Sequence, residues 1–323
     1  MKNKVILVTG IGGNVGQGII RNIRVSYPDI EIIGTDIVAV SSGNHLCEKV
    51  YVLPSSKDKR YISAVKKICS KEKVDLIIPS TDYEVYYLAL HKDSLPVVAC
   101  SDANFAGICL NKYKTWENFC KYKIPFAETI LPVRYNGEFK QFIVKPAEGR
   151  GSRDIFINPS NIKNFSKNFI VQKYYKGKEI TTGFYVTKSG TLLGHITMLR
   201  ALNNGTTSQC EVTRDYDNAV EEIIKKIMSH FSIKGSCNIQ SIVTKNGNII
   251  PFELNCRISG TNSIRSHFGF EDVCYTVDEY LYNKTPKKPI IIGGSAVRIL
   301  MDVIYPWKKL SEIENKSTEH IIF

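Results

Sequence analysis

The sequence predicts an open α/β domain followed by an α+β region built on antiparallel strands. The 323 residues exceed the ~150 typical of one domain, which favours about two domains. Strand-like and helix-like segments alternate up to Asp102, and hairpin-like strands separated by turn residues follow it. The composition, 43% hydrophobic and 23% charged, is that of an ordinary globular protein.

The first region has the pattern of parallel strands joined by helices. Its first strand, Val5–Val8, is continuously apolar, as burial on both faces of a parallel sheet requires. A glycine-rich turn and an apolar-periodic helix over 15–25 follow. Further strands are expected at 31–35, 74–79 and 95–99, and a further helix at 59–71. We therefore expect an open α/β domain of roughly 105 residues.

In the second region, after Asp102, the alternation of strands and helices gives way to a pattern typical of antiparallel strands. A helix over 111–121 leads into three hairpin-like stretches between 141 and 201, whose strands are separated by turn residues. A helix is expected at 219–230, before two strands within 235–255. The pair Asn246-Gly247 between those strands predicts a two-residue hairpin turn.

Charge, hydropathy and cysteine usage restrict the class of protein. The net charge of +12 favours anionic partners, but the lysines are dispersed, so nucleic-acid binding is not expected. No stretch approaches the ~20 apolar residues of a membrane span, and the apolar run near the N-terminus is too short for a signal peptide. Nine scattered cysteines without a CxxC pair indicate free thiols. We expect a cytoplasmic protein without a membrane partner.

The loop Gly10–Gly16 follows a strand and opens a helix, as dinucleotide-binding loops do, and Asp36 stands about twenty residues on. Tyr174 and Lys178 have the spacing of a dehydrogenase catalytic pair. That spacing requires a helix, whereas Gly177 and the β-prone flanks indicate a strand. An NAD(P)-dependent dehydrogenase or epimerase stays an alternative, and so does a purely structural glycine turn.

Four polar features follow one another in the second region. Two lysines aimed at one site neutralise an oligophosphate, and a Gly/Ser loop offers backbone N–H groups to an anion. Carboxylate and amide side chains two apart on a strand share a face, and such oxygens suit Mg²⁺. The features are Lys112 at a helix start, Lys145 with the loop Glu148–Arg153, the strand 171–175 with Glu179, and Gln240 with Glu253, Asn255 and Arg257.

In this order the features resemble the ATP-grasp superfamily, most closely its carbamoyl-phosphate-synthetase-like carboxylate–amine ligases. The resemblance covers about residues 105–275 and includes E-x-N-x-R at 253–257. It implies a Rossmann-like N-terminal (pre-ATP-grasp) domain at 1–105 that no longer carries NAD. It further implies a two-lobed ATP-grasp domain with antiparallel sheets at 106–290 and a C-terminal segment at 291–323 that completes the ATP-grasp sheet.

The resemblance also implies roles for individual residues. Those implied to bind ATP are Lys112, Lys145, Gly149, Arg150, Gly151, Ser152, Gln172, Lys173, Tyr174, Tyr175 and Glu179. Those implied to bind Mg²⁺, or Mn²⁺ in its place, are Gln240, Glu253 and Asn255. The implied catalytic cations are Arg257, Arg200 and Lys145. Gln240 stands where many ligases have an acidic residue.

The implied activity is an ATP-dependent ligation that forms a C–N bond. ATP would phosphorylate a small carboxylate, an amino acid or sugar acid, and an amine or thiol would displace phosphate from the acyl phosphate. Arg298, alone in an apolar run, joins Arg257 as a candidate for holding the substrate carboxylate. By family analogy we expect small-molecule substrates and a homodimer. An ATP-grasp kinase and a non-catalytic nucleotide-binding regulator are further alternatives.

Overall fold

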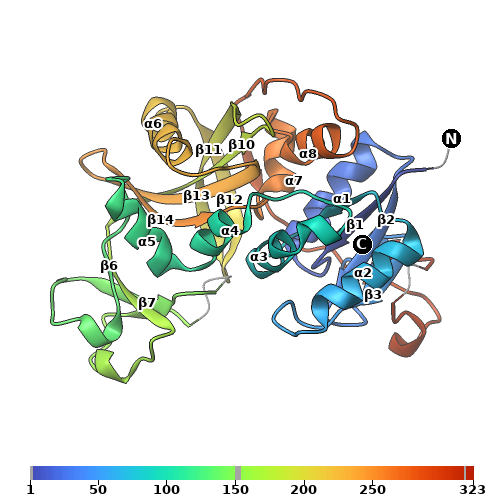
Figure 1. Ribbon diagram of the computed structural model, residues 1–323, viewed down its shortest axis with the longest axis horizontal. Helices are drawn as coiled ribbons and strands as arrows, with labels where there is room; N and C mark the ends of the chain where they lie inside the picture. The colour runs from blue at the N-terminus through green and yellow to red at the C-terminus, as the bar shows by residue number, and fades with distance from the viewer. Residues whose placement is uncertain (1–2, 150–153, 316–317) are drawn as a thin grey trace.

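The computed structural model describes residues 3–149, 154–315 and 318–323 (Figure 1). Its N-terminal part is a five-stranded parallel sheet with the strand order β3-β2-β1-β4-β5. The strands are β1 (Val5–Thr9), β2 (Glu31–Asp36), β3 (Lys49–Val52), β4 (Leu76–Ile78) and β5 (Val97–Val98), and the helices are α1 (Asn14–Ser26), α2 (Tyr61–Glu72) and α3 (Asp82–Leu90).

Both faces of this sheet are buried, which explains why β1 is apolar without interruption. Ile19 and Ile23 of α1 pack on one face, and α8 (Asp272–Tyr280) joins them there through Val273. Tyr61 and Val65 of α2 pack on the opposite face. The predicted α/β domain is confirmed, although β3 and α3 were not expected from the sequence.

Two antiparallel sheets follow, as predicted. The smaller has the order β6-β9-β7-β8 and the larger β14-β13-β10-β11-β12-β15. The strands of the smaller sheet are β6 (Thr129–Ile130), β7 (Phe142–Pro146), β8 (Phe156–Ile157) and β9 (Phe169–Lys173). Those of the larger are β10 (Gly177–Val186), β11 (Leu192–Asn203), β12 (Thr206–Thr213), β13 (Gly235–Thr244), β14 (Ile249–Asn255) and β15 (Ser295–Val297). The remaining helices are α4 (Ala103–Leu110), α5 (Lys112–Lys121), α6 (Asp217–Met228) and α7 (Asn262–Arg265).

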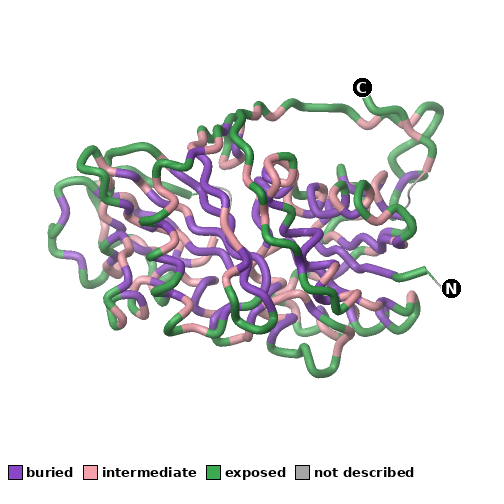
Figure 2. The backbone as a smooth tube through the Cα atoms, turned by 90° about the horizontal axis from the view of Figure 1, so that it is seen from above, coloured by how far each residue is buried: buried purple, intermediate pink, exposed green. Residues whose placement is uncertain are grey.

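The larger sheet has one apolar and one polar face. Along β13, Cys237 and Ile239 enter the core against α6, while Asn238 and Gln240 lie on the opposite face. Figure 1 shows α6 alongside this sheet, and Figure 2 shows the buried strands at the centre of both halves of the molecule. The polar face of the larger sheet is therefore available to form a site.

The turn between β13 and β14 is one residue longer than predicted. Gly247 N donates to Thr244 O at 2.9 Å, and Thr244 N donates to Asn248 O at 3.0 Å. These bonds enclose a three-residue loop, and Gly247 has φ +79°, in the left-handed region that favours glycine. The two-residue prediction was wrong, but the hairpin itself is present.

Only part of the C-terminal segment enters the larger sheet. β15 pairs with β12, whereas β16 (Val303–Ile304) and β17 (Ile321–Ile322) form a separate two-stranded sheet. This hairpin reaches the N-terminal domain, where Asn315 N donates to Ala39 O at 3.0 Å. Most of the segment is exposed (Figure 2).

Short 3₁₀ turns connect these elements. They lie at Asn44–Leu46, Lys92–Ser94, Pro132–Arg134, Ile162–Asn164, Ser266–Phe268 and Leu310–Glu312. Within the described ranges, no helix is both long and apolar enough to cross a membrane. All nine cysteines have free thiols.

Candidate active site

A cavity of about 260 Å³ lies between the smaller and larger antiparallel sheets. Apolar side chains from both sheets form its walls, which gives a slot suited to a flat aromatic base. These side chains include Ile143, Ile157, Ile242, Ile250 and Phe252.

Most of the residues expected at a nucleotide line this cavity together. They are Lys112, Lys145, Gly149, Gln172, Lys173, Tyr174, Tyr175, Glu179, Gln240 and Glu253. Gln172 is buried and its Nε2 donates to Thr129 Oγ1 at 3.1 Å, which links β9 to β6. Three of the expected nucleotide residues, Arg150, Gly151 and Ser152, lie outside the described residues.

Two buried lysines converge at the end of the cavity. Lys112 begins α5, and its Nζ lies 3.2 Å from Gly149 O and 3.8 Å from Glu253 Oε2. Lys145 ends β7 and is only 5% exposed. A cation at the positive end of a helix, beside a second cation, is only partly compensated by one carboxylate. The arrangement therefore favours binding of a polyanion.

The charges of this cluster depend on one another. Burial, together with the charge on Lys112, lowers the pKa of Lys145 to about 7. Burial acts to raise the pKa of Glu253, but the positive charges of Lys112 and Lys145 outweigh it and the net shift is downward. Glu253 is therefore an anion facing two lysines.

Glu253 belongs to a group of three oxygen-bearing side chains on the polar sheet face. The pairing of β13 with β14 puts Gln240 opposite Glu253. Gln240 Nε2 lies 3.4 Å from Glu253 Oε1 and 3.2 Å from Asn255 Oδ1, and Asn255 Nδ2 donates to Glu253 Oε1 at 3.1 Å. Together they offer one carboxylate and two amide groups, whose oxygens are of the kind that Mg²⁺ prefers.

Among the described residues, no histidine, cysteine or further carboxylate joins these three side chains to form a metal-binding cluster. Across the described residues, no set of three or more His, Cys, Asp or Glu side chains is arranged to hold a metal ion. A metal here would depend on one carboxylate and two amides, with phosphate oxygens completing its shell.

Arg200 on β11 ties two of the expected residues together. Its Nε and Nη2 donate to Glu179 Oε1 at 2.8 and 2.5 Å, and Nη2 also reaches Gln240 Oε1 at 2.6 Å. Glu179, which the resemblance implies to bind ATP, is thus paired with Arg200 in this structure.

Arg257 pairs with a residue of the N-terminal domain that the sequence did not reveal. Its Nη2 donates to Asp82 Oδ2 at 2.9 Å, and Asn255 Nδ2 approaches Asp82 Oδ1 at 3.4 Å. Asp82 starts α3, which Thr81 caps by accepting from Glu84 N. The T-x-x-E pattern at 81–84, after a predicted strand, could have indicated a helix that begins at Asp82.

A second cavity, of about 850 Å³, separates the N-terminal domain from the larger sheet. The glycine loop forms part of one wall, and residues of β11, β13 and β14 form the other. The expected residues in this cleft are Arg200, Gln240, Glu253, Asn255 and Arg257. Gln240 and Glu253 line both cavities, so the two spaces meet at these side chains.

Arg298 has a different environment from the one expected. Its Nε donates to Thr207 O at 3.0 Å and its Nη2 to Gly260 O at 2.9 Å. It is not among the described residues that line the cleft. The side chain joins β12 to the loop after β14.

The dehydrogenase alternative finds little support. Asp36 Oδ2 accepts from Gly12 N at 2.7 Å, so this carboxylate is bound to the glycine loop. Tyr174 lies between strands and Lys178 lies on β10, so no helix aligns them. The loop is a wall of the cleft.

The sequence matches two family models in succession. Residues 6–100 match the PylC-like N-terminal domain, and residues 109–261 match the ATP-grasp domain. No curated protein matches the chain.

Solved structures share the fold at low identity. N5-Carboxyaminoimidazole synthetase from Staphylococcus aureus, complexed with ADP, aligns with a TM-score of 0.75 and 12% identity, over 93% of this chain and 83% of that one. Carboxyaminoimidazole ribonucleotide synthase from Aspergillus clavatus, complexed with ATP, gives 0.71 and 14%, over 88% and 78%. The biotin carboxylase domain of Hydrogenobacter thermophilus 2-oxoglutarate carboxylase gives 0.72 and 12%, over 98% and 77%.

The chain therefore carries an ATP-grasp domain that follows a PylC-like N-terminal domain. Its fold is that of the solved structures named above.

Proposed function

We propose that the protein transfers the γ-phosphoryl group of ATP to the carboxylate of a small molecule, and that an amine then displaces phosphate. The carboxylate would be an amino acid or a sugar acid. The observation that carries the proposal is the meeting of two cavities at Gln240 and Glu253, beside the buried lysines. A phosphoryl donor in one cavity would there face an acceptor in the other.

The residues of the chain would act mainly by position and charge. Lys112 and Lys145 would neutralise phosphate oxygens, and the slot would hold the base next to Tyr175. Arg257, held by Asp82, would lie beside the transferring group. Gln240, Glu253 and Asn255 would hold Mg²⁺, which supplies charge neutralisation at the phosphates when bound; Mn²⁺ would suit the same oxygens.

The proposal also includes a cellular compartment and an oligomeric state. The nine free thiols suit a reducing compartment such as the cytoplasm. Small-molecule substrates and a homodimer follow by analogy with the structural relatives. The second cavity, lined by polar side chains, supplies the space that such substrates would need.

Hydroxylamine trapping tests the reaction, because acyl phosphates react with this amine to give hydroxamates. The protein is incubated with Mg·ATP, hydroxylamine and a panel of amino acids and sugar acids, and ADP and hydroxamate are measured. Glu253→Ala should lower turnover by about a hundredfold or more. Glu117→Ala, an exposed carboxylate on α5, is the matched control and should leave turnover unchanged.

Other outcomes identify other classes. ADP release that requires a hydroxy compound but yields no hydroxamate would favour a kinase. Thermal stabilisation by NADPH and not by Mg·ADP would contradict the proposal, since a bound ligand at ~100 times its Kd adds about 2.7 kcal/mol.

A further inference from the structure

Asn238 is a nearly buried amide on the polar face of the larger sheet. It lies on β13, two residues before Gln240 and opposite Asn255 on β14, and it is 1% exposed. Its Oδ1 accepts from Thr181 Oγ1 at 3.0 Å and from Ser259 Oγ at 3.0 Å. Two hydroxyl donors occupy the carbonyl oxygen, so the orientation of the amide is determined.

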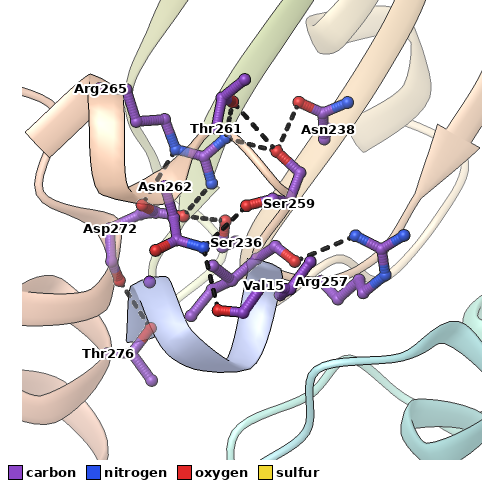
Figure 3. Close-up of polar contacts among 12 residues, drawn as sticks. Val15, Ser236, Asn238, Arg257, Ser259, Thr261, Asn262, Arg265, Asp272 and Thr276 are labelled. Atoms are coloured by element: carbon purple, nitrogen blue, oxygen red, sulfur yellow. Dashed lines mark hydrogen bonds and ion pairs between the residues drawn. The ribbon is translucent and has the colours of Figure 1, made fainter. Parts of the chain in front are cut away.

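The amino group of this amide faces the cleft. Asn238 lines the second cavity, and no residue in the described ranges accepts a hydrogen bond from its Nδ2. Figure 3 shows the nitrogen pointing away from Ser259. Arg257 lines the same cleft.

A buried ion pair maintains the direction of the Ser259 hydroxyl. Arg265 is 0% exposed and its Nη1 donates to Ser259 Oγ at 2.7 Å. Since Ser259 accepts from a cation, its single proton is available for Asn238. Asp272, 1% exposed, holds Arg265 in turn by accepting from Nε at 3.1 Å and from Nη2, and Ser236 also donates to it (Figure 3).

A glycine in the larger sheet leaves the space that the Arg265 side chain occupies. Gly183 on β10 is the register partner of Asn238, and a Cβ at Gly183 would lie 2.6 Å from Arg265 Nη1. The guanidinium therefore occupies the place where the side chain of a sheet residue would be. Arg265 is therefore a buried cation placed behind the cleft, where it fixes the orientation of Ser259 and, through Ser259, that of the Asn238 amide.

We propose that Asn238 Nδ2 binds an anionic oxygen of the carboxylate substrate in the cleft that Arg257 also lines, and that Ser259, Arg265 and Asp272 are its positioning residues. The inference rests on the proposed function for the identity of the ligand. An amide that presents only its donors, in a cleft that also contains a guanidinium, selects an acceptor group such as a carboxylate. It disfavours an ammonium group at the same place.

Asn238→Asp tests the contact with a minimal change of shape. The aspartate keeps an oxygen for Thr181 and Ser259 but replaces the donor by an anion. With a carboxylate from the hydroxamate screen, the KM for that carboxylate should rise about tenfold or more, while the KM for ATP changes less than about twofold. Asn248→Asp, an exposed asparagine of the β13–β14 loop, is the control. Equal effects on both KM values would overturn the inference.

The positioning residues are tested at Ser259, because a change at Arg265 or Asp272 could unfold the protein. Ser259→Ala should raise the carboxylate KM without changing the affinity for Mg·ADP. Ser259→Thr keeps a hydroxyl and should restore the KM. A Ser259→Ala variant with the wild-type KM for the carboxylate would overturn the inference that Ser259 positions Asn238.

A spectroscopic measurement is independent of turnover. In protein labelled with ¹⁵N-asparagine and loaded with Mg·ADP, the side-chain amide signal absent from Asn238→Asp belongs to Asn238. Acetate should shift this signal and methylammonium should not. If Mg·ADP binds but acetate leaves the signal in place, the inference fails and the proposed function stands. If Mg·ADP does not bind, the proposed function fails, and the acetate titration of the unloaded protein still decides the inference.

Discussion

Lys145 is a buried cation whose positive charge has no ion-pair partner among the residues that the structure describes. Its ammonium group lies 5.2 Å from the centre of the Phe252 ring. The pKa of Lys145, about 7 in the folded protein, compares with ~10.4 for an unperturbed lysine. The side chain therefore changes charge within the range in which enzymes are assayed.

The stability of the protein without nucleotide should respond to this titration. Below pH 7 both the folded and unfolded chains carry the proton, and the cost of burying the charge is fully present. Between about pH 7 and 10 the unfolded chain binds more protons, so the contribution of Lys145 to the free energy of unfolding rises with pH. Urea unfolding on the two sides of this window should show the rise, and Lys145→Met should lose it. Lys121→Met, on the exposed end of α5, should keep it; equal slopes in all three proteins would contradict the prediction.

At the scale of elements, α1 and α7 join the two domains. Asn262 Nδ2 donates to Val15 O at 3.2 Å, and Asn22 Nδ2 reaches Asn262 Oδ1 at 3.3 Å. Figure 3 shows the amide of Asn262 directed at the first turn of α1. Gly18 makes this approach feasible, because a Cβ there would lie 2.3 Å from Asn262 Oδ1.

Gly18→Ala should therefore destabilise the protein. In an ordinary helix the change to alanine adds about 1 kcal/mol of stability. Here the methyl group displaces Asn262 and breaks its bonds to α1, and we expect a net loss of about 1–2 kcal/mol. In an Asn262→Ala background the same substitution should become neutral or stabilising. A double-mutant cycle from denaturant unfolding measures the difference, and additive effects would argue against the contact.

The elements found from sequence are those with a strong local pattern. The continuous apolar run of β1 predicted its strand, because burial on both faces dictates that pattern, and the Asn246-Gly247 turn signal predicted the hairpin of β13 and β14. β3 has four residues, of which only Val50 is buried, and α3 is apolar around most of its surface, so neither has a clear period.

The same limit applies to the candidate site. Lys112, Lys145 and Glu253 were predicted because their order along the chain resembles that of the ATP-grasp family. Asp82 and Asn238 were missed, because their surroundings come from segments far away in sequence: Arg257 for the first, Thr181 and Ser259 for the second. Pattern alone does not reveal which distant hydroxyl will orient an amide.

At the scale of the whole molecule, the C-terminal segment is the most exposed apolar part. Leu300 is 98% exposed and Trp307 101%, whereas Trp116 is half-buried beside Tyr113. Segment 298–323 carries four basic and four acidic residues, so it is neutral in a chain of net charge +12.

The two tryptophans allow the position of this segment to be measured in solution. Iodide should quench most of the emission that Trp307→Phe removes, since a collisional quencher needs contact with the ring, and less of the emission that Trp116→Phe removes. Emission from Trp307 that iodide does not quench would contradict an exposed segment and would show that another surface covers it.

The Arg265 guanidinium lies where Gly183 has no side chain, and it makes positions 183, 265 and 272 dependent on one another. Any larger residue at position 183 would need the arginine at 265 to leave, and its departure would leave Asp272 as a buried anion without its partner. Single substitutions at these three positions should therefore be tolerated poorly, and only joint replacement should be tolerated. In related chains the three residues should be inherited or exchanged as one unit.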